Sequence, residues 1–152
     1  MLSTFSIARR RFAAFAVAAL VLGAGACKDS TSPEEEPEVV TMRITPAGGS
    51  AVTVNSTGVV TGTLSVPAAG SRAFTVEFLN AAGQPDPVVD GTTFQVSVAP
   101  AAGMTFTRTG PFAGTLTAGA AGTVAVQLGL LHIEENHNDF GPFTVNVTVT
   151  AP

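Results

Sequence analysis

The feature that most constrains the fold of this chain is an alternation of apolar and polar residues that begins at Val39 and recurs to the end of the sequence. The clearest example is the run Ser71–Leu79, in which Phe74, Val76 and Phe78 share one side. A period of two is typical of β-strands that bury one face. We therefore expect Ser71–Leu79 to form a strand in the middle of a sheet.

Similar short runs occupy most of the remaining sequence, and glycine, proline and asparagine separate them. They are Val39–Thr45, Ala51–Asn55, Val59–Val66, Phe94–Val98, Met104–Arg108, Phe112–Thr117, Val124–Leu130 and Phe143–Val149. The segment Asn80–Gly91 is a long connection that we expect to cross between sheets, and the last two runs predict a hairpin at the centre of the core. Short strands at this spacing, with no helical pattern among them, predict an all-β fold and an antiparallel β-sandwich.

One glycine-rich stretch gives this sandwich a family likeness. The sequence of Gly114–Val126 resembles bacterial immunoglobulin-like domains of surface proteins, in which a glycine turn leads into a valine-rich penultimate strand. The resemblance covers residues 39–152. It implies an immunoglobulin-like sandwich of about 7–9 strands that acts as a structural or interaction module. A jelly roll or another sandwich is the alternative.

The N-terminus has the layout of a secretory signal peptide over residues 1–26. Three arginines precede the uncharged run Phe12–Ala26, which is shorter than the roughly 20 residues of a membrane-spanning helix. The end of the run, Leu22–Cys27, resembles a bacterial lipobox, and the resemblance implies that Cys27 carries lipid. An ordinary cleavage site beside an incidental cysteine is the alternative. Arg9–Phe12 partly resembles a twin-arginine export signal, with a plain basic head as the other interpretation.

A lipidated Cys27 would place the protein in the bacterial cell envelope, anchored to a membrane. Residues 27–38 combine this acylated cysteine with an acidic, proline- and serine-rich tether that holds no large apolar side chain. Lys28 directly follows the cysteine, which by resemblance to lipoprotein sorting signals implies the outer membrane in a cell that has two membranes. The expected partners are this membrane and an envelope protein.

Charge and residue content exclude several function classes. From Cys27 onward the chain has four basic residues, Lys28, Arg43, Arg72 and Arg108, against eleven acidic ones, a net charge of −7. Nucleic acid is therefore not an expected partner, since its binding depends on Lys and Arg. No cysteine follows Cys27 and no serine has a nucleophile-elbow pattern, so we do not expect an enzyme, and the sequence identifies no small-molecule substrate.

Chemically active side chains gather in one segment, Leu131–Pro142. Both histidines and three carboxylates lie within eight residues: His132, Glu134, Glu135, His137 and Asp139. Imidazole and carboxylate together suit zinc or copper. If the strand continues through Glu134, then His132 and Glu134 project to the same side, while His137 and Asp139 share a returning segment.

Two other interpretations of this segment stay open. It is either a solvated hairpin tip, in which the polar residues serve the turn, or a loop that contacts a partner. The leading functional hypothesis is an envelope lipoprotein with an interaction module, and the alternative is an envelope protein that binds zinc or copper through His132–Asp139. No other cofactor is expected.

Overall fold

The computed structural model describes residues 35–151, and these residues form ten β-strands and no helix. The strands are β1 (Thr41–Pro46), β2 (Val52–Asn55), β3 (Val60–Thr61), β4 (Leu64–Pro67), β5 (Ser71–Leu79), β6 (Phe94–Pro100), β7 (Met104–Gly110), β8 (Ala113–Ala118), β9 (Gly122–His132) and β10 (His137–Thr150). The all-β prediction is confirmed for this part of the chain, which contains no helix able to span a membrane. The predicted signal peptide and Cys27 lie outside the described residues.

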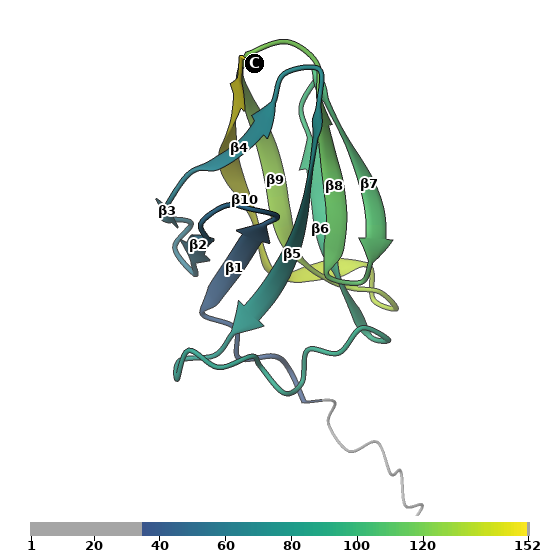
Figure 1. The fold of residues 1–152 in the computed structure, drawn as a ribbon. Helices are drawn as coiled ribbons and strands as arrows, with labels where there is room; N and C mark the ends of the chain where they lie inside the picture. The colour runs from purple at the N-terminus through teal and green to yellow at the C-terminus, as the bar shows by residue number, and fades with distance from the viewer. Residues whose placement is uncertain (1–34, 152) are drawn as a thin grey trace, which may run out of the picture. The chain divides into compact units, whose positions relative to one another are not determined.

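The strands are divided between two sheets (Figure 1). Six strands form the larger sheet in the order β3-β2-β1-β5-β8-β7, and four form the smaller one in the order β4-β10-β9-β6. The strand β5 lies between β1 and β8, which confirms the prediction of a central strand. The hairpin of β9 and β10 forms the middle of the smaller sheet, as the alternation also predicted.

One hydrophobic core draws on both sheets. The alternating residues of β5, Phe74, Val76 and Phe78, are at most 4% exposed, and Leu128 and Leu130 of β9 are fully buried. All belong to a single cluster of buried side chains. Burying a side chain of this size stabilises the fold by about 1.5–3 kcal/mol. Because the domain has no disulfide among its described residues, this packing and the strand pairing hold it together.

The prediction of one strand over Val59–Val66 is wrong. The segment forms two short strands, β3 in the larger sheet and β4 in the smaller one. The chain changes sheets at Gly62, whose φ is +97°, and a Cβ there would lie 3.1 Å from the carbonyl oxygen of Ala51. Glycine tolerates both the positive φ and the close approach. Alternation cannot reveal such a crossing, because a period of two is the same in either sheet.

The crossing also explains two other departures from expectation. The structure has ten strands rather than about 7–9, because the Val59–Val66 run divides into two. It also contains one parallel pair, in which Leu64–Pro67 of β4 lies beside Val147–Thr150 of β10, whereas every other strand pair is antiparallel.

The connection between β5 and β6 crosses from the larger sheet to the smaller one, as predicted. Its anchor is Asp86, a carboxylate only 5% exposed. Asp86 accepts hydrogen bonds from the backbone N–H of Val88 at 2.9 Å and of Glu38 at 2.8 Å. A buried carboxylate needs such donors to replace water. Asp86 therefore fastens the chain entering β1 to the 80–93 connection.

The turn between β7 and β8 also bridges the two sheets, and it lies beside the 80–93 connection, since a Cβ at Gly91 would be 2.8 Å from the Cγ atom of Pro111. The carbonyl oxygen of Phe112 accepts a hydrogen bond from Val76 of β5, and that of Pro111 accepts one from Val96 of β6, both at 2.8 Å. The carbonyl groups of adjacent residues thus bond to strands of different sheets, which ties the sheets together at this point.

Candidate metal centre at the β9–β10 hairpin

The connection between the last two strands is shorter than predicted. The sequence suggested a segment Leu131–Pro142, but β9 continues to His132 and β10 already begins at His137. Only residues 133–136 form the turn. The expectation of a long loop is wrong, because the polar residues 137–139 belong to β10. They lie in a strand with a β-bulge, and polar residues in such a strand resemble those of a turn.

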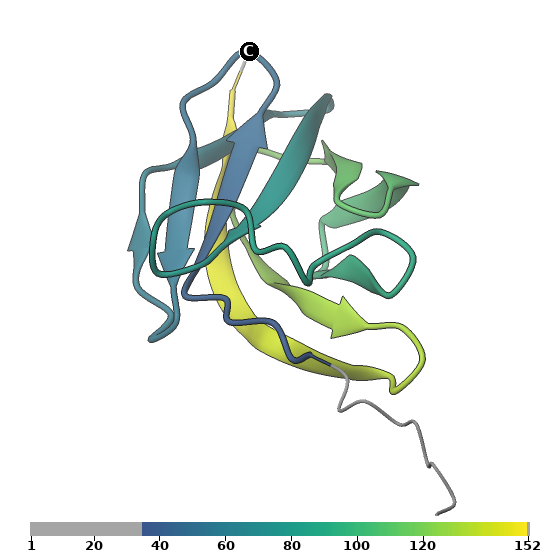
Figure 2. The same ribbon diagram turned by 90° about the horizontal axis from the view of Figure 1, so that it is seen from below.

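The four-residue turn has well-defined hydrogen bonds. The N–H of Asn136 donates to the carbonyl oxygen of His132 at 3.0 Å. Asn136 has a φ of +54°, a left-handed conformation that asparagine adopts more readily than most residues. The N–H of Ile133 donates at 2.9 Å to the carbonyl oxygen of Thr93 just before β6. The turn is thereby joined to the 80–93 connection, and Figures 1 and 2 show both at the same end of the molecule.

His132 occupies the last inward position of β9. It follows Leu128 and Leu130 at a spacing of two and is 6% exposed. Its ring packs against Phe94 of β6, with ring centroids 4.8 Å apart and an interplanar angle of 41°. An imidazole therefore stands where the row of core residues would otherwise continue, at the edge between the hydrophobic core and the polar turn.

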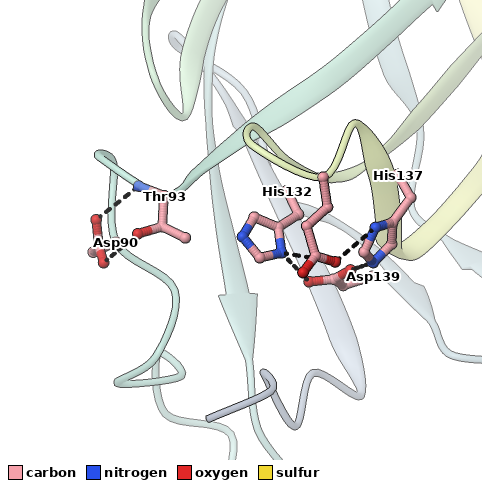
Figure 3. A network of polar contacts seen from close by, with 6 residues as sticks. Asp90, Thr93, His132, His137 and Asp139 are labelled. Carbon is pink, nitrogen blue, oxygen red and sulfur yellow. Dashed lines mark hydrogen bonds and ion pairs between the residues drawn. The ribbon is translucent and has the colours of Figure 1, made fainter. Parts of the chain in front are cut away.

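Asp139 is brought to the same place by a β-bulge. Asn138 pairs with Leu131 and Phe140 pairs with Leu130, so Asp139 is an extra residue with no partner position in β9. A bulge redirects side chains without ending the strand. It lets Phe140 enter the core at 6% exposure while the Asp139 side chain, 13% exposed, faces the histidines (Figure 3).

A hydrogen bond on the outer face of the sheet supports this bulge. The hydroxyl of Ser97 on β6 donates to the Oδ1 atom of Asn138 on β10 at 2.7 Å, across the intervening strand β9. Gly129 lies where they meet, and a Cβ there would be 2.7 Å from the carbonyl oxygen of Phe140 and 3.0 Å from the Ser97 hydroxyl. Glycine is required for this close approach.

Four of the five predicted side chains come together (Figure 3). The Nδ1 atom of His132 lies 3.7 Å from Oε2 of Glu135 and 3.8 Å from Oδ2 of Asp139. The Nδ1 atom of His137 lies 3.2 Å from the same Glu135 oxygen, and its Nε2 atom contacts Oδ1 of Asp139. Imidazole and carboxylate alternate around a closed ring, so this arrangement is suited to holding a cation.

Glu134 does not join this cluster. It is exposed in the turn, because β9 ends at His132. The expectation that His132 and Glu134 project to one side, which required the strand to continue, is therefore wrong. Glu135 takes this place, and its Oε2 atom approaches both histidines.

Two carboxylates elsewhere have structural partners. Asp90 accepts hydrogen bonds from the backbone N–H groups of Thr92 at 2.6 Å and Thr93 at 3.1 Å. The hydrogen bond from the Thr92 hydroxyl has the largest effect on Asp90, followed by the bond from the Thr92 backbone N–H, and these bonds lower the pKa of Asp90 to about 2. Glu77 accepts a hydrogen bond from Arg43 at 2.8 Å, and this bond raises the pKa of Arg43. Asp90 thus serves the turn before β6, and Figure 3 shows it apart from the histidine cluster.

The 80–93 connection also lines an open depression of about 300 Å³, bounded by Glu35, Pro87, Val88, Asp90, Thr93 and Phe94. Phe94 contributes to this depression and also packs against His132. Sequence reasoning missed Phe94, Ser97 and Gly129 as residues that support the hairpin. No local pattern marks them, because each meets the hairpin only through strand pairing.

Comparison with models of protein families, with curated proteins and with solved structures found no match to this chain.

Proposed function

We propose that this chain is a bacterial envelope lipoprotein, anchored at the outer membrane through Cys27, whose immunoglobulin-like domain acts as a non-catalytic interaction module. The order of the strands supports the immunoglobulin-like assignment. In the constant-type fold, strands A-B-E-D face strands C-F-G. Here β1-β5-β8-β7 belong to one sheet and β6-β9-β10 to the other in the corresponding order, with β2, β3 and β4 as additions.

The observation that carries the proposed role is the meeting of two loops at one end of this domain. By strand correspondence, the 80–93 connection is the B–C loop and the turn 133–136 is the F–G loop. The bond from Ile133 to Thr93 joins them directly. In immunoglobulin variable domains the same two loops form part of the ligand-binding end. We name this end the loop pole: residues 35–38, 80–93 and 132–139.

The charge of the loop pole indicates the kind of partner. It contains eight of the nine carboxylates among residues 35–151: Glu35, Glu36, Glu38, Asp86, Asp90, Glu134, Glu135 and Asp139. None of the three arginines of the described residues belongs to it. Complementary charge steers association and excludes partners of like charge. The proposed partner is an envelope protein with a basic contact surface.

Affinity capture from solubilised envelope tests the role. The full chain carrying Glu134→Lys, within the loop pole, is compared with the full chain carrying Ala120→Lys, an exposed position beyond the end of β8. A partner recovered by the wild type and by Ala120→Lys, but not by Glu134→Lys, supports recognition at the loop pole. A partner retained equally by both variants, or no partner above control, contradicts it.

The anchor has its own test. The mature N-terminus should be an acylated Cys27 by mass spectrometry, and Cys27→Ser should release the protein from the membrane fraction, because the acyl chains provide the binding energy. An unmodified thiol at position 27 would rule out the lipid anchor and leave the loop pole to be tested separately.

A further inference from the structure

We infer that the β9–β10 hairpin binds one divalent ion of the zinc and copper class, held by His132, Glu135, His137 and Asp139. This site goes beyond the proposed interaction role and does not depend on it. Three of the four residues, His132, Glu135 and His137, offer donor atoms that all lie within 4.8 Å of one another. Asp139 adds a fourth through its contacts with both histidines.

The spacing of the donor atoms matches a coordination shell. In a tetrahedral site with metal–ligand distances of about 2.0–2.2 Å, neighbouring donors lie about 3.3–3.6 Å apart. Three of the four imidazole–carboxylate contacts of the cluster have separations of 3.2, 3.7 and 3.8 Å, and the fourth, between Nε2 of His137 and Oδ1 of Asp139, is a direct pair. Isolated hydrogen-bonded pairs would be closer, at about 2.7–2.9 Å. The three longer separations involve Nδ1 of both histidines, Oε2 of Glu135 and Oδ2 of Asp139, and these are the atoms that we place around a common centre.

The site is half preorganised. The side chains of His132 and Asp139 are 7% and 13% exposed. Packing against Phe94 holds His132 in place, and the β-bulge positions Asp139. Those of His137 and Glu135 are 52% and 55% exposed. Side chains at the surface change rotamer at little cost. The buried pair therefore provides a fixed half of the shell, and the exposed pair closes over an ion that arrives from solvent.

A solvated hairpin tip does not require this arrangement. His132 takes a core position that follows two leucines of β9, and the bulge interrupts the ladder to bring Asp139 beside it. Interrupting a strand ladder costs free energy. Bulges are concentrated next to functional sites, where they redirect a side chain. Both departures from a regular hairpin converge on the same centre, which a binding site explains.

The donor atoms define the ion. Two imidazole nitrogens with carboxylate oxygens suit Zn²⁺ and Cu²⁺, whereas Mg²⁺ and Ca²⁺ prefer an all-oxygen shell. At an N/O site without special geometry, Cu²⁺ binds more tightly than Zn²⁺. We therefore expect affinity in the order copper, zinc, magnesium.

Isothermal titration of the full chain, purified in mild detergent without chelators, tests the site with zinc chloride, copper(II) chloride and magnesium chloride. The wild type should take up about one equivalent of zinc or copper and no magnesium. His137→Ala and Asp139→Asn should each weaken zinc binding by about tenfold or more. Glu134→Gln is the matched control, since it removes a neighbouring charge outside the cluster, and it should bind zinc as the wild type does.

Circular dichroism of each variant without metal separates loss of ligand from loss of fold. His137 is the decisive position, because its half-exposed side chain can be removed without opening the core. The site is overturned if folded wild-type protein gives no heat with zinc or copper. It is also overturned if His137→Ala and Asp139→Asn both keep wild-type zinc affinity, or if Glu134→Gln loses as much zinc affinity as those two variants.

Discussion

The two halves of the β9–β10 hairpin differ sharply, although they are parts of the same pair of strands. Toward the free end of β10, every residue from Phe143 to Val149 pairs in unbroken register with Leu128 to Gly122. Toward the turn, the register shifts twice within a few residues, once at Asp139 and again between Phe140 and Phe143. The regular half packs a core and the irregular half gathers histidines and carboxylates. Regular pairing provides stability, whereas a site is created where the pairing is interrupted.

The largest expected effect lies in the regular half. Leu128 is fully buried, so Leu128→Ala should destabilise the domain by about 2–5 kcal/mol through lost burial and the cavity left behind. Urea unfolding followed by far-UV circular dichroism measures this, since the chain contains neither tryptophan nor tyrosine. The folded variant should keep its zinc affinity. Loss of zinc binding as complete as in His137→Ala would show that the two halves are not separable.

Zinc should act through the irregular half. An ion that binds only the folded state at about 100 times its dissociation constant adds about 2.7 kcal/mol of stability. The unfolding temperature of the wild type should therefore rise with zinc, and that of His137→Ala should not. Thermal unfolding with and without the ion measures the difference. An equal rise in both proteins would mean that the hairpin is not where zinc binds.

Gly129→Ala should affect both halves. The added Cβ would meet the carbonyl oxygen of Phe140 at 2.7 Å, a backbone atom that cannot rotate away, and overpacking of this kind costs about 1–3 kcal/mol. The displaced bulge should also weaken zinc binding. Gly119→Ala is the control, because its Cβ would have only an ordinary 3.6 Å contact. Unchanged stability and zinc affinity in Gly129→Ala would show that the bulge does not depend on the close contact between position 129 and the carbonyl oxygen of Phe140.

The smallest effect is expected outside the hairpin, at Asp90. Its hydrogen bonds to Thr92 and Thr93 hold its pKa at about 2, below the ordinary value of about 3.9. The carboxylate therefore contributes stability above pH 4, and this contribution is lost as the pH falls toward 2. Asp90→Asn should be less stable than the wild type at pH 7 and equal to it near pH 2. Unfolding temperatures at pH 7, 4 and 2 measure this; a constant difference would contradict the assignment.

Alternation predicted the regular parts of the fold because one buried face imposes a period of two. The run Ser71–Leu79 became a strand with the predicted bounds and the predicted inward residues. The crossing at Gly62 and the bulge at Asp139 were not predictable in this way, since each depends on which strand lies alongside. The same limit applies to the candidate site: its ligands are close in sequence and were found, apart from Glu134, which the early end of β9 excludes.

The supports of the site could not be found from the sequence for a related reason. Phe94 and Ser97 belong to β6, more than thirty residues before the turn of the hairpin, and they reach it only because β6 pairs with β9. Their spacing predicts a strand and nothing more. Partners distant along the chain become visible only when the register is known.

The crossing at Gly62 affects how copies of this domain would behave when crowded together. On that side the sheets end in β3, a strand of two residues, and β4, a strand of four residues that closes with Pro67. Neither offers a long row of unpaired backbone groups on which a neighbouring copy could extend the sheet, and short proline-ended edges discourage such growth. Densely displayed copies would therefore remain separate along this flank and would not fuse into fibrous arrays there.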